Sequence, residues 1–181
     1  MAEKEYTLPR ARFDKPVKLL IVVAPFYRDI ADDLIAGAKA EIEATGATYD
    51  LVEVPGALEV PTAIRIADTT SNFDGYVALG CVIRGETTHY ETVCNDSSRG
   101  ITLLGLQGLC IGNGILTVEN RAQAEVRADP ARMNKGAGAG AAALHLVALS
   151  RKWGASRKGV GFLPGAEEYK LAGDFKDNPT A

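Results

Sequence analysis

The chain has few of the residues that usually build disulfide frameworks, metal sites or membrane spans. Its 181 residues include three cysteines and two histidines. The cysteines are odd in number and unrelated in spacing, which indicates reduced thiols and argues against a disulfide framework or a zinc site. No run of about 20 apolar residues occurs, and the charged N-terminus lacks the apolar segment of a signal peptide. We therefore expect a cytoplasmic protein with no membrane partner and no metal.

The chain also lacks a strong excess of one charge. Its formal net charge is −3, with acidic and basic residues interspersed, so it offers neither a basic surface for nucleic acid nor a polybasic strip for a membrane. Hydrophobic residues make up 46% of the chain and charged residues 24%, which suits one domain with a well-formed core. We therefore expect a small-molecule partner and no nucleic acid.

Segments with the patterns of strands and helices alternate along the chain. Residues 18–24 form a β-branched apolar run, and an apolar residue then recurs at every fourth position from Ile30 to Ile42, as on one helix face. The alternation continues with strands expected at 49–54, 75–80 and 109–118, and helices at 59–68, 89–104, 120–130 and 135–153. This order predicts an α/β fold, a three-layer doubly wound sandwich with a four-stranded, mainly parallel sheet of the flavodoxin-like kind.

The two ends of the chain differ from its middle. Residues 1–16 and 155–181 are polar and poorly periodic, so we expect an N-terminal arm, an α/β domain at 17–154 and a C-terminal extension. We expect these arms to lie on a neighbour or to be partly disordered. The helix expected at 135–153 is crowded with Gly and Ala, which lets another backbone approach closely and favours self-association.

Residues 79–89 have the pattern of a candidate site. They lead from a buried-looking strand, through Gly85, into the start of an expected helix. Ligands of parallel sheets bind outside the carboxyl ends of the strands, and the hydroxyls and free amides of Thr87 and Thr88 could hold a phosphate there. His89 has an ordinary pKa of about 6.5, which suits proton transfer near neutrality. The alternative is that Thr88 caps the helix and His89 is a surface residue.

Other loops should reach the same end of the sheet. Phe26 follows the first strand and could stack on a flat heterocycle, although an aromatic residue there more often packs in the core. Residues 57–59 begin a helix and could offer amides and the Glu59 carboxylate to hydroxyl groups, or that carboxylate could simply favour the helix dipole. The loop at 113–120 ends the fourth strand. Arg127, near a helix end, could pair with a phosphate or be solvated.

Several motifs resemble those of the 6,7-dimethyl-8-ribityllumazine synthase family, in order and at matching spacing over about residues 17–153. They are Pro25-Phe26, Val54-Pro55-Gly56-Ala57-Leu58-Glu59, the whole of 79–89, Thr117-Val118-Glu119-Asn120 and Asn134-Lys135-Gly136. The combination of Gly-x-x-x-Arg-Gly-x-Thr-x-His with an upstream Pro-Gly-Ala-x-Glu is not a general α/β signature. The resemblance implies a transferase of riboflavin biosynthesis. It would condense 5-amino-6-(D-ribitylamino)uracil with 3,4-dihydroxy-2-butanone 4-phosphate in the penultimate step, with no cofactor and no metal.

The resemblance also implies roles for individual residues. His89 would be the catalytic proton carrier, and Phe26 would stack on the pyrimidine. The remaining implied contacts are the ribityl chain at Ala57, Leu58 and Glu59, the uracil edge at Cys81, Val82 and Ile83, the phosphate at Glu86, Thr87 and Arg127, and the pocket wall at Lys135.

The chain departs from the family pattern at three places. Asn113 stands where many members place an aromatic or apolar residue over the pyrimidine, so a hydrogen bond could replace that contact. Tyr27 stands where Asn is frequent, and residues 129–133 lack the Gly-rich bend of members that form icosahedral shells. We therefore favour a pentamer or a pair of pentamers over a sixty-subunit capsid. The family places its sites between adjacent subunits, with Arg127 and the fourth loop supplied by a neighbour; riboflavin synthase is a further candidate partner.

Two other functions are consistent with parts of the sequence. Cys81 or Cys94 could be a nucleophile activated by His89, as in a thiol hydrolase, although no orienting acid is identifiable. A non-catalytic protein that binds lumazine or flavin as a carrier or scaffold is the second alternative. The presence of both His89 and Arg127 argues against it, whereas Asn113 leaves room for it.

Overall fold

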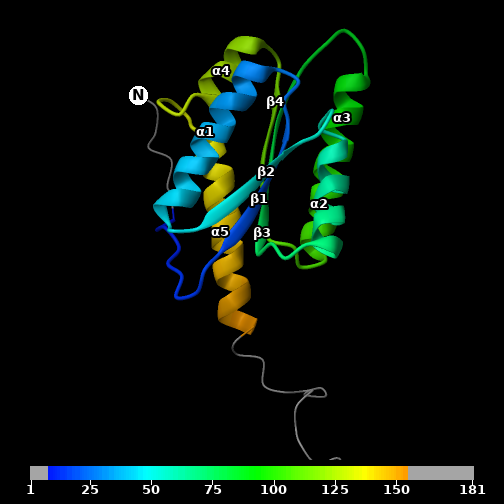
Figure 1. Cartoon of the computed structure of the whole chain (residues 1–181). Helices are drawn as coiled ribbons and strands as arrows, with labels where there is room; N and C mark the ends of the chain where they lie inside the picture. Colours follow the sequence, from blue (N-terminus) through cyan, green and yellow to red (C-terminus); the bar gives the residue numbers. More distant parts are fainter. Residues whose placement is uncertain (1–7, 155–181) are drawn as a thin grey trace, which may run out of the picture.

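The computed structural model describes residues 8–154, which form a four-stranded parallel sheet covered by helices (Figure 1). The strand order is β2-β1-β3-β4, so the chain first adds β2 on one side of β1 and then crosses to add β3 and β4 on the other. This confirms the expected α/β fold. The elements are β1 Lys18–Ala24, α1 Arg28–Ala44, β2 Thr48–Glu53, α2 Glu59–Thr70, β3 Gly75–Ile83, α3 His89–Leu106, β4 Ile111–Val118, α4 Arg121–Ala128 and α5 Lys135–Gly154.

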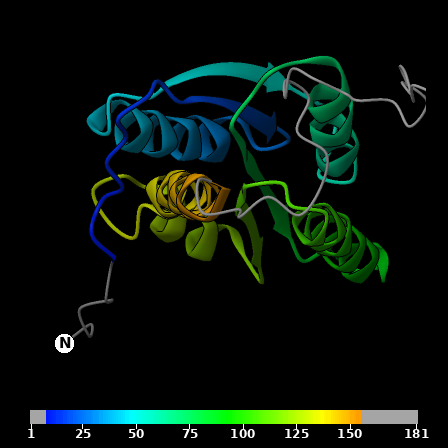
Figure 2. The same cartoon turned by 90° about the horizontal axis from the view of Figure 1, so that it is seen from below.

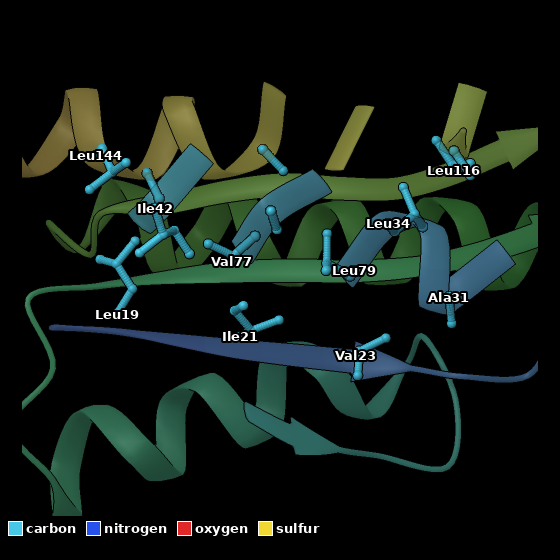
Figure 3. Packing of buried hydrophobic residues seen from close by; sticks show 14 of the residues in the cluster. Leu19, Ile21, Val23, Ala31, Leu34, Ile42, Val77, Leu79, Leu116 and Leu144 are labelled. Atoms are coloured by element: carbon cyan, nitrogen blue, oxygen red, sulfur yellow. The ribbon is translucent and has the colours of Figure 1, made fainter. Parts of the chain in front are cut away.

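Helices cover the two faces of the sheet unequally. Helices α1, α4 and α5 pack on one face and α2 and α3 on the other, as the view from below shows (Figure 2). Side chains that alternate along β1 enter the two cores. Leu19, Ile21 and Val23 face α1 and α5 (Figure 3), whereas Leu20 and Val22 face α2 and α3. The continuous apolar run of β1 is therefore explained by burial on both faces.

Helix α5 packs closely on the chain's own α1 and β4. A Cβ at Gly136 would collide with the backbone of Leu34, and one at Gly112 would collide with the backbone of Ala139. The buried residues of α5 also include Gly140 and Ala143. The buried small residues of this helix therefore contact the chain's own α1 and β4, whereas Gly138, Ala141 and Ala142 are exposed, and the expected contact with a neighbour stays a prediction.

The third strand is longer than the apolar pattern predicts. Its apolar run was expected to end at Gly80, but β3 continues to Ile83 because residues 81–83 pair with Leu116–Val118 of β4. Pairing with β1 stops earlier, at Ala24 and Gly80. Within the described part of the chain, the last three residues of β3 therefore have a strand on one side only.

The residues before β1 lie on their own chain. Arg10 donates three hydrogen bonds to Glu41 of α1, and Phe13 packs against the core. Arg151 of α5 donates to the Lys15 and Pro16 carbonyls and to Asp74. Residues 8–16 of the expected N-terminal arm are thus attached to α1 and α5. Residues 1–7 and the expected C-terminal extension, 155–181, lie outside the described residues.

No helix within residues 8–154 combines the length and the apolar character needed to cross a membrane.

Candidate functional site

The candidate site lies where β1 and β3 separate at their carboxyl ends. The chain leaves β1 in one direction toward β2 and leaves β3 in the other direction toward β4, so a crevice opens outside these two neighbouring strand ends. Phe26 follows β1, and residues 84–88 follow β3. The start of α2, at residues 57–59, follows the neighbouring β2 at the same end.

Phe26 is exposed at the end of β1. Its exposed fraction is 75%, and its ring meets the Tyr27 ring edge to face at 5.0 Å between centroids. The core-packing alternative for Phe26 is therefore wrong. The ring presents a face to solvent in this chain, as a stacking platform for a flat ligand does.

The backbone at the end of β3 has unused hydrogen-bonding capacity. Arg84 N donates to Val118 O at 2.9 Å, so the N–H of the preceding residue, Ile83, points to the opposite side, toward the position that β1 has left. Cys81 is buried, whereas Val82 and Ile83 are half-buried. Polar backbone groups therefore line the crevice beside a partly apolar wall.

Residues 85–88 form an exposed loop that ends in helix α3. Thr87 Oγ1 accepts a hydrogen bond from His89 N at 3.4 Å. Thr88 occupies the N-cap position, but its side chain makes no capping bond to any described residue, so the alternative that it is there to cap the helix is not supported. Glu86, Thr87 and His89 are all exposed. The N-terminal amides of α3 thus face solvent beside a hydroxyl and an imidazole.

The start of α2 combines one buried and two exposed residues. Ala57 is buried, and Leu58 and Glu59 are exposed. The carboxylate of Glu59 folds back toward Gly56, since a Cβ there would lie 2.9 Å from Glu59 Oε2. This arrangement holds an acceptor over the turn that follows β2.

Charged pairs that the sequence alone did not reveal surround the crevice. Arg28 binds both carboxylate oxygens of Glu53, at 2.7 and 3.0 Å, and this hydrogen bonding lowers the pKa of Glu53. Arg121 of α4 pairs with Asp29 of α1. The partners are 25 and 92 positions apart along the chain, so no local pattern indicates them.

The largest of these clusters is centred on Arg84. Its Nε donates to Glu119 Oε2 at 2.6 Å, its Nη1 donates to Glu91, and its guanidinium carbon lies 4.1 Å from the centroid of the Tyr90 ring. The hydrogen bond from Arg84 is the main cause that lowers the pKa of Glu91. Arg84 belongs to the motif at 79–89, but no role for its side chain is predicted from the sequence.

A second group of predicted residues lies in a groove at the edge of the sheet. The groove has a volume of about 380 Å³ and is lined by β4, α4 and α5, including Asn113, Arg127 and Lys135. Asn113 Oδ1 accepts from Ile115 N at 3.0 Å, which leaves the amide nitrogen as the donor toward solvent. Arg127 is half-buried and donates to the Gln123 carbonyl at 3.1 Å, and within residues 8–154 it makes no ion pair.

The predicted site residues therefore fall into two groups in one chain. The ends of β1, β2 and β3 bring Phe26, residues 57–59, residues 81–83 and the loop to His89 to one end of the sheet. The other group lies in the groove lined by β4, α4 and α5, and within residues 8–154 strand β4 is an edge strand that pairs with β3 alone.

The cysteines do not have the surroundings of nucleophiles. Burial raises the pKa of Cys81 to about 11, and burial is also the main cause that raises the pKa of Cys94. A catalytic cysteine needs the opposite shift, because the thiolate is the reactive form. The thiol-hydrolase alternative therefore has no support. Among residues 8–154, no group of three or more His, Cys, Asp and Glu side chains is placed to hold a metal ion.

These features define a doubly wound α/β protein with a candidate site at the switch point of a parallel sheet. The family profile described as 6,7-dimethyl-8-ribityllumazine synthase matches residues 16–151. The chain is 59% identical over 152 residues to the 6,7-dimethyl-8-ribityllumazine synthase of Jannaschia sp. (strain CCS1), covering 84% of this chain and 85% of the relative. It is 55% identical over 136 residues to the protein of the same name from Novosphingobium aromaticivorans, covering 75% and 98%.

A third relative is named 6,7-dimethyl-8-ribityllumazine synthase 1, from Rhizobium meliloti (strain 1021). It is 49% identical over 149 residues, which cover 79% of this chain and 97% of the relative. The chain belongs to the 6,7-dimethyl-8-ribityllumazine synthase family, and the resemblance in its motifs is confirmed.

Proposed function

We propose that this protein is a transferase that forms 6,7-dimethyl-8-ribityllumazine in the penultimate step of riboflavin biosynthesis. Its substrates are 5-amino-6-(D-ribitylamino)uracil and 3,4-dihydroxy-2-butanone 4-phosphate, and inorganic phosphate is released. Beside membership of the family, one observation carries the proposal. The crevice between the ends of β1 and β3 joins an exposed aromatic ring, free backbone polar groups and a helix N-terminus beside His89.

The pyrimidine substrate binds in the crevice itself. Phe26 stacks on its ring, and the backbone of residues 81–83 holds the uracil edge. After Gly80, β3 pairs with β4 but no longer with β1, and this supports the assignment. The edge of the uracil ring carries amide-like donors and acceptors, which can form the hydrogen bonds that β1 no longer supplies. Ala57, Leu58 and Glu59 hold the ribityl chain, whose hydroxyl groups suit the exposed Glu59 carboxylate.

The phosphorylated substrate binds at the start of α3. Glu86 and Thr87 offer amides and a hydroxyl where the helix dipole favours an anion. Arg127 of an adjacent subunit supplies the positive charge, with Lys135 nearby in the same groove. Within residues 8–154 Arg127 has no carboxylate partner, which supports a role toward an external anion.

The reaction begins when the exocyclic amine of the pyrimidine attacks the ketone to give an imine. Phosphate leaves after removal of a proton, and the remaining amine then condenses with the carbonyl left on the four-carbon unit to close the ring. The imine formation and the ring closure each release one water. His89, exposed at the first position of α3, moves the protons. Arg127 stabilises the departing phosphate by charge-assisted hydrogen bonds, and holding the two substrates face to face accounts for much of the acceleration.

The site is completed by a neighbouring subunit in a pentamer or a pair of pentamers. Two different surfaces support a head-to-tail contact, which closes into a ring when the rotation allows. One is the groove at the β4 edge. The other carries exposed apolar side chains of β2, α2 and α3, namely Val52, Ile66, Leu103 and Leu106. A sixty-subunit shell, a cytoplasmic location and an association with riboflavin synthase stay predictions from the sequence.

The alternative of a non-catalytic lumazine or flavin carrier is less favoured. Asn113 presents an amide donor where an aromatic contact is usual, and this supports an altered pyrimidine contact rather than a lost activity. Membership of the family and an exposed His89 both favour catalysis.

The proposal is tested by mixing the purified protein with both substrates in the absence of added metal or nucleotide. We expect lumazine absorbance and fluorescence to appear with one phosphate released per product. Reactions without protein and with His89→Gln measure the background. Replacement of a general acid or base typically costs about 10²- to 10⁴-fold in rate, so the His89→Gln reaction should be at least about a hundredfold slower. No product above the protein-free reaction at saturating substrates would exclude the synthase.

A further inference from the structure

Arg84 is the most highly connected side chain at the end of β3. It joins three parts of the chain: its own strand end, Glu91 in the first turn of α3, and Glu119 immediately after β4. The flat guanidinium also lies over the Tyr90 ring, with 4.1 Å from its carbon to the ring centroid. A planar group with several donors in a fixed fork can make these three contacts together, which a lysine ammonium cannot.

The loop that follows Arg84 has few contacts of its own. Residues 85–88 are all exposed, and a Cβ at Gly85 would meet nothing within 4 Å. Inside the loop, the side-chain bond between Thr87 Oγ1 and His89 N is long, at 3.4 Å. The bond from Arg84 to Glu91 spans seven positions and thus encloses this whole segment. The shape of the loop therefore depends on how its two ends are held.

The charge of Arg84 is already neutralised within the chain. Two carboxylates accept from it, and both contacts raise the pKa of Arg84 above its ordinary value. A guanidinium that donates to two carboxylates has fewer free donors for a ligand anion, and those carboxylates repel the anion. Its contacts explain the position of the loop better than they explain a direct contact with phosphate.

We propose that Arg84 is a positioning residue: by holding Glu91 and Glu119 together, it fixes residues 85–88 so that Thr87 and His89 face the phosphorylated substrate. The inference rests on the proposed function of this site. A displacement of about 1 Å in such a loop costs up to about a hundredfold in rate, whereas exposed ion pairs contribute little to global stability. Loss of Arg84 should therefore reduce catalysis much more than folding.

The experiment uses the full chain in its native assembly and compares four variants. Arg84→Ala removes the contacts, Arg84→Lys keeps only the charge, and Glu91→Gln combined with Glu119→Gln removes the partners. Arg65→Ala is the matched control, because Arg65 is an exposed arginine that pairs with Asp68 at 2.8 Å on α2, away from the loop. Steady-state kinetics with each substrate varied, inhibition by inorganic phosphate and the melting temperature are measured for each.

The positioning role predicts a specific pattern. Arg84→Ala lowers kcat/KM for the phosphorylated substrate by about ten- to a hundredfold and changes the KM of the pyrimidine by less than about threefold. Arg84→Lys falls between this variant and the wild type, and the double glutamine variant weakens phosphate inhibition in the same direction as Arg84→Ala. The melting temperatures stay within about 4 °C of the wild type. Arg65→Ala behaves as the wild type.

Each other outcome rejects the inference. If the double glutamine variant binds phosphate more tightly, the freed Arg84 is itself an anion ligand. If activity falls only in proportion to a lower melting temperature, its role is purely structural, and wild-type kinetics in Arg84→Ala would remove it from the site altogether. Calorimetric phosphate titration of the same variants tests the loop even if the wild-type chain forms no lumazine, so the two proposals can fail separately.

Discussion

The contact between α1 and α5 and the open end of the sheet are held together by different means. At the first, small residues let backbones touch, and a Cβ at Gly136 has no space beside Leu34. At the second, exposed loops are joined by ion pairs such as Arg28 with Glu53 and Arg84 with Glu119. Shape therefore determines the first region and charge determines the second. A dense interface tolerates few changes, whereas charged loops can adjust around a ligand.

The strongest test of this contrast changes one glycine of α5. Gly136→Ala should lower the free energy of unfolding by about 3 kcal/mol, because the new Cβ meets backbone that cannot move aside. Gly138→Ala is the control on the same helix, since a Cβ there meets nothing within 4 Å. It should be neutral or stabilising by up to about 1 kcal/mol. Equal stability of the two variants in denaturant unfolding would contradict the close packing.

In the groove lined by β4, α4 and α5, removal of the Arg127 side chain should affect the reaction and not folding. Arg127→Ala should lower kcat/KM for the phosphorylated substrate by about ten- to a hundredfold, since a hydrogen bond to a charged group is lost. The KM for the pyrimidine should change little. Arg132→Ala, an exposed arginine after α4, is the control and should keep wild-type kinetics. An unchanged rate and affinity in Arg127→Ala would remove this residue from the site.

A smaller effect is expected at the start of α4, which carries Arg127. Asn120 Oδ1 accepts from Gln123 N at 3.0 Å, and the Gln123 side chain accepts from Glu119 N at 3.0 Å. Asn120→Ala should lower the free energy of unfolding by about 1 kcal/mol, measured by thermal or denaturant unfolding. Asn120→Ser keeps a capping oxygen and should recover most of this loss. If both variants lose the same amount, the cap does not stabilise the helix.

The smallest effect on activity is expected from modification of Cys81, a buried residue near the end of β3. Burial raises its pKa to about 11, so at pH 7.5 it is a protonated thiol, and a thiol-blocking reagent should leave most activity intact. Alkylation, followed by mass spectrometry, should speed up as pH rises toward 11. The unfolding free energy should fall over the range from about pH 8.5, the ordinary thiol pKa, to about 11, because only the unfolded state ionises there. Activity lost in proportion to Cys81 modification at pH 7.5 would revive a nucleophilic role.

The sequence predicted the architecture well where a strand is buried on both faces of the sheet or where apolar residues recur at a regular spacing along a helix. The run at 18–24 and the spacing of Ile30, Leu34, Ala38 and Ile42 gave β1 and α1, and all of these apolar side chains are buried. The capping pattern of Asn120 and Gln123 was also confirmed, with the Gln side chain bonded to the N–H of Glu119. In each of these cases the cause lies within one turn or one strand.

The sequence failed where the cause lies far along the chain. It ended β3 at Gly80, because the pairing that extends the strand comes from residues 116–118 of β4. It gave no role to Arg84, whose partners, Glu91 and Glu119, look like ordinary solvated glutamates. It predicted that another backbone approaches α5 closely but not that α1 of the same chain does so at Gly136, because composition does not say which backbone approaches a glycine. The roles of the predicted site residues stay predictions, which the variants described above test.

The early end of the β1 ladder has a further consequence. Past Gly80, β3 resembles the edge of a sheet for three residues, although the rest of the strand lies in the interior. A flat ligand that forms hydrogen bonds with this backbone replaces those that β1 no longer supplies. The amide hydrogens at the end of β3 should therefore exchange more slowly when the ligand is bound. The hydrogen-exchange rate of the Ile83 amide should then measure how much of the crevice is occupied by ligand.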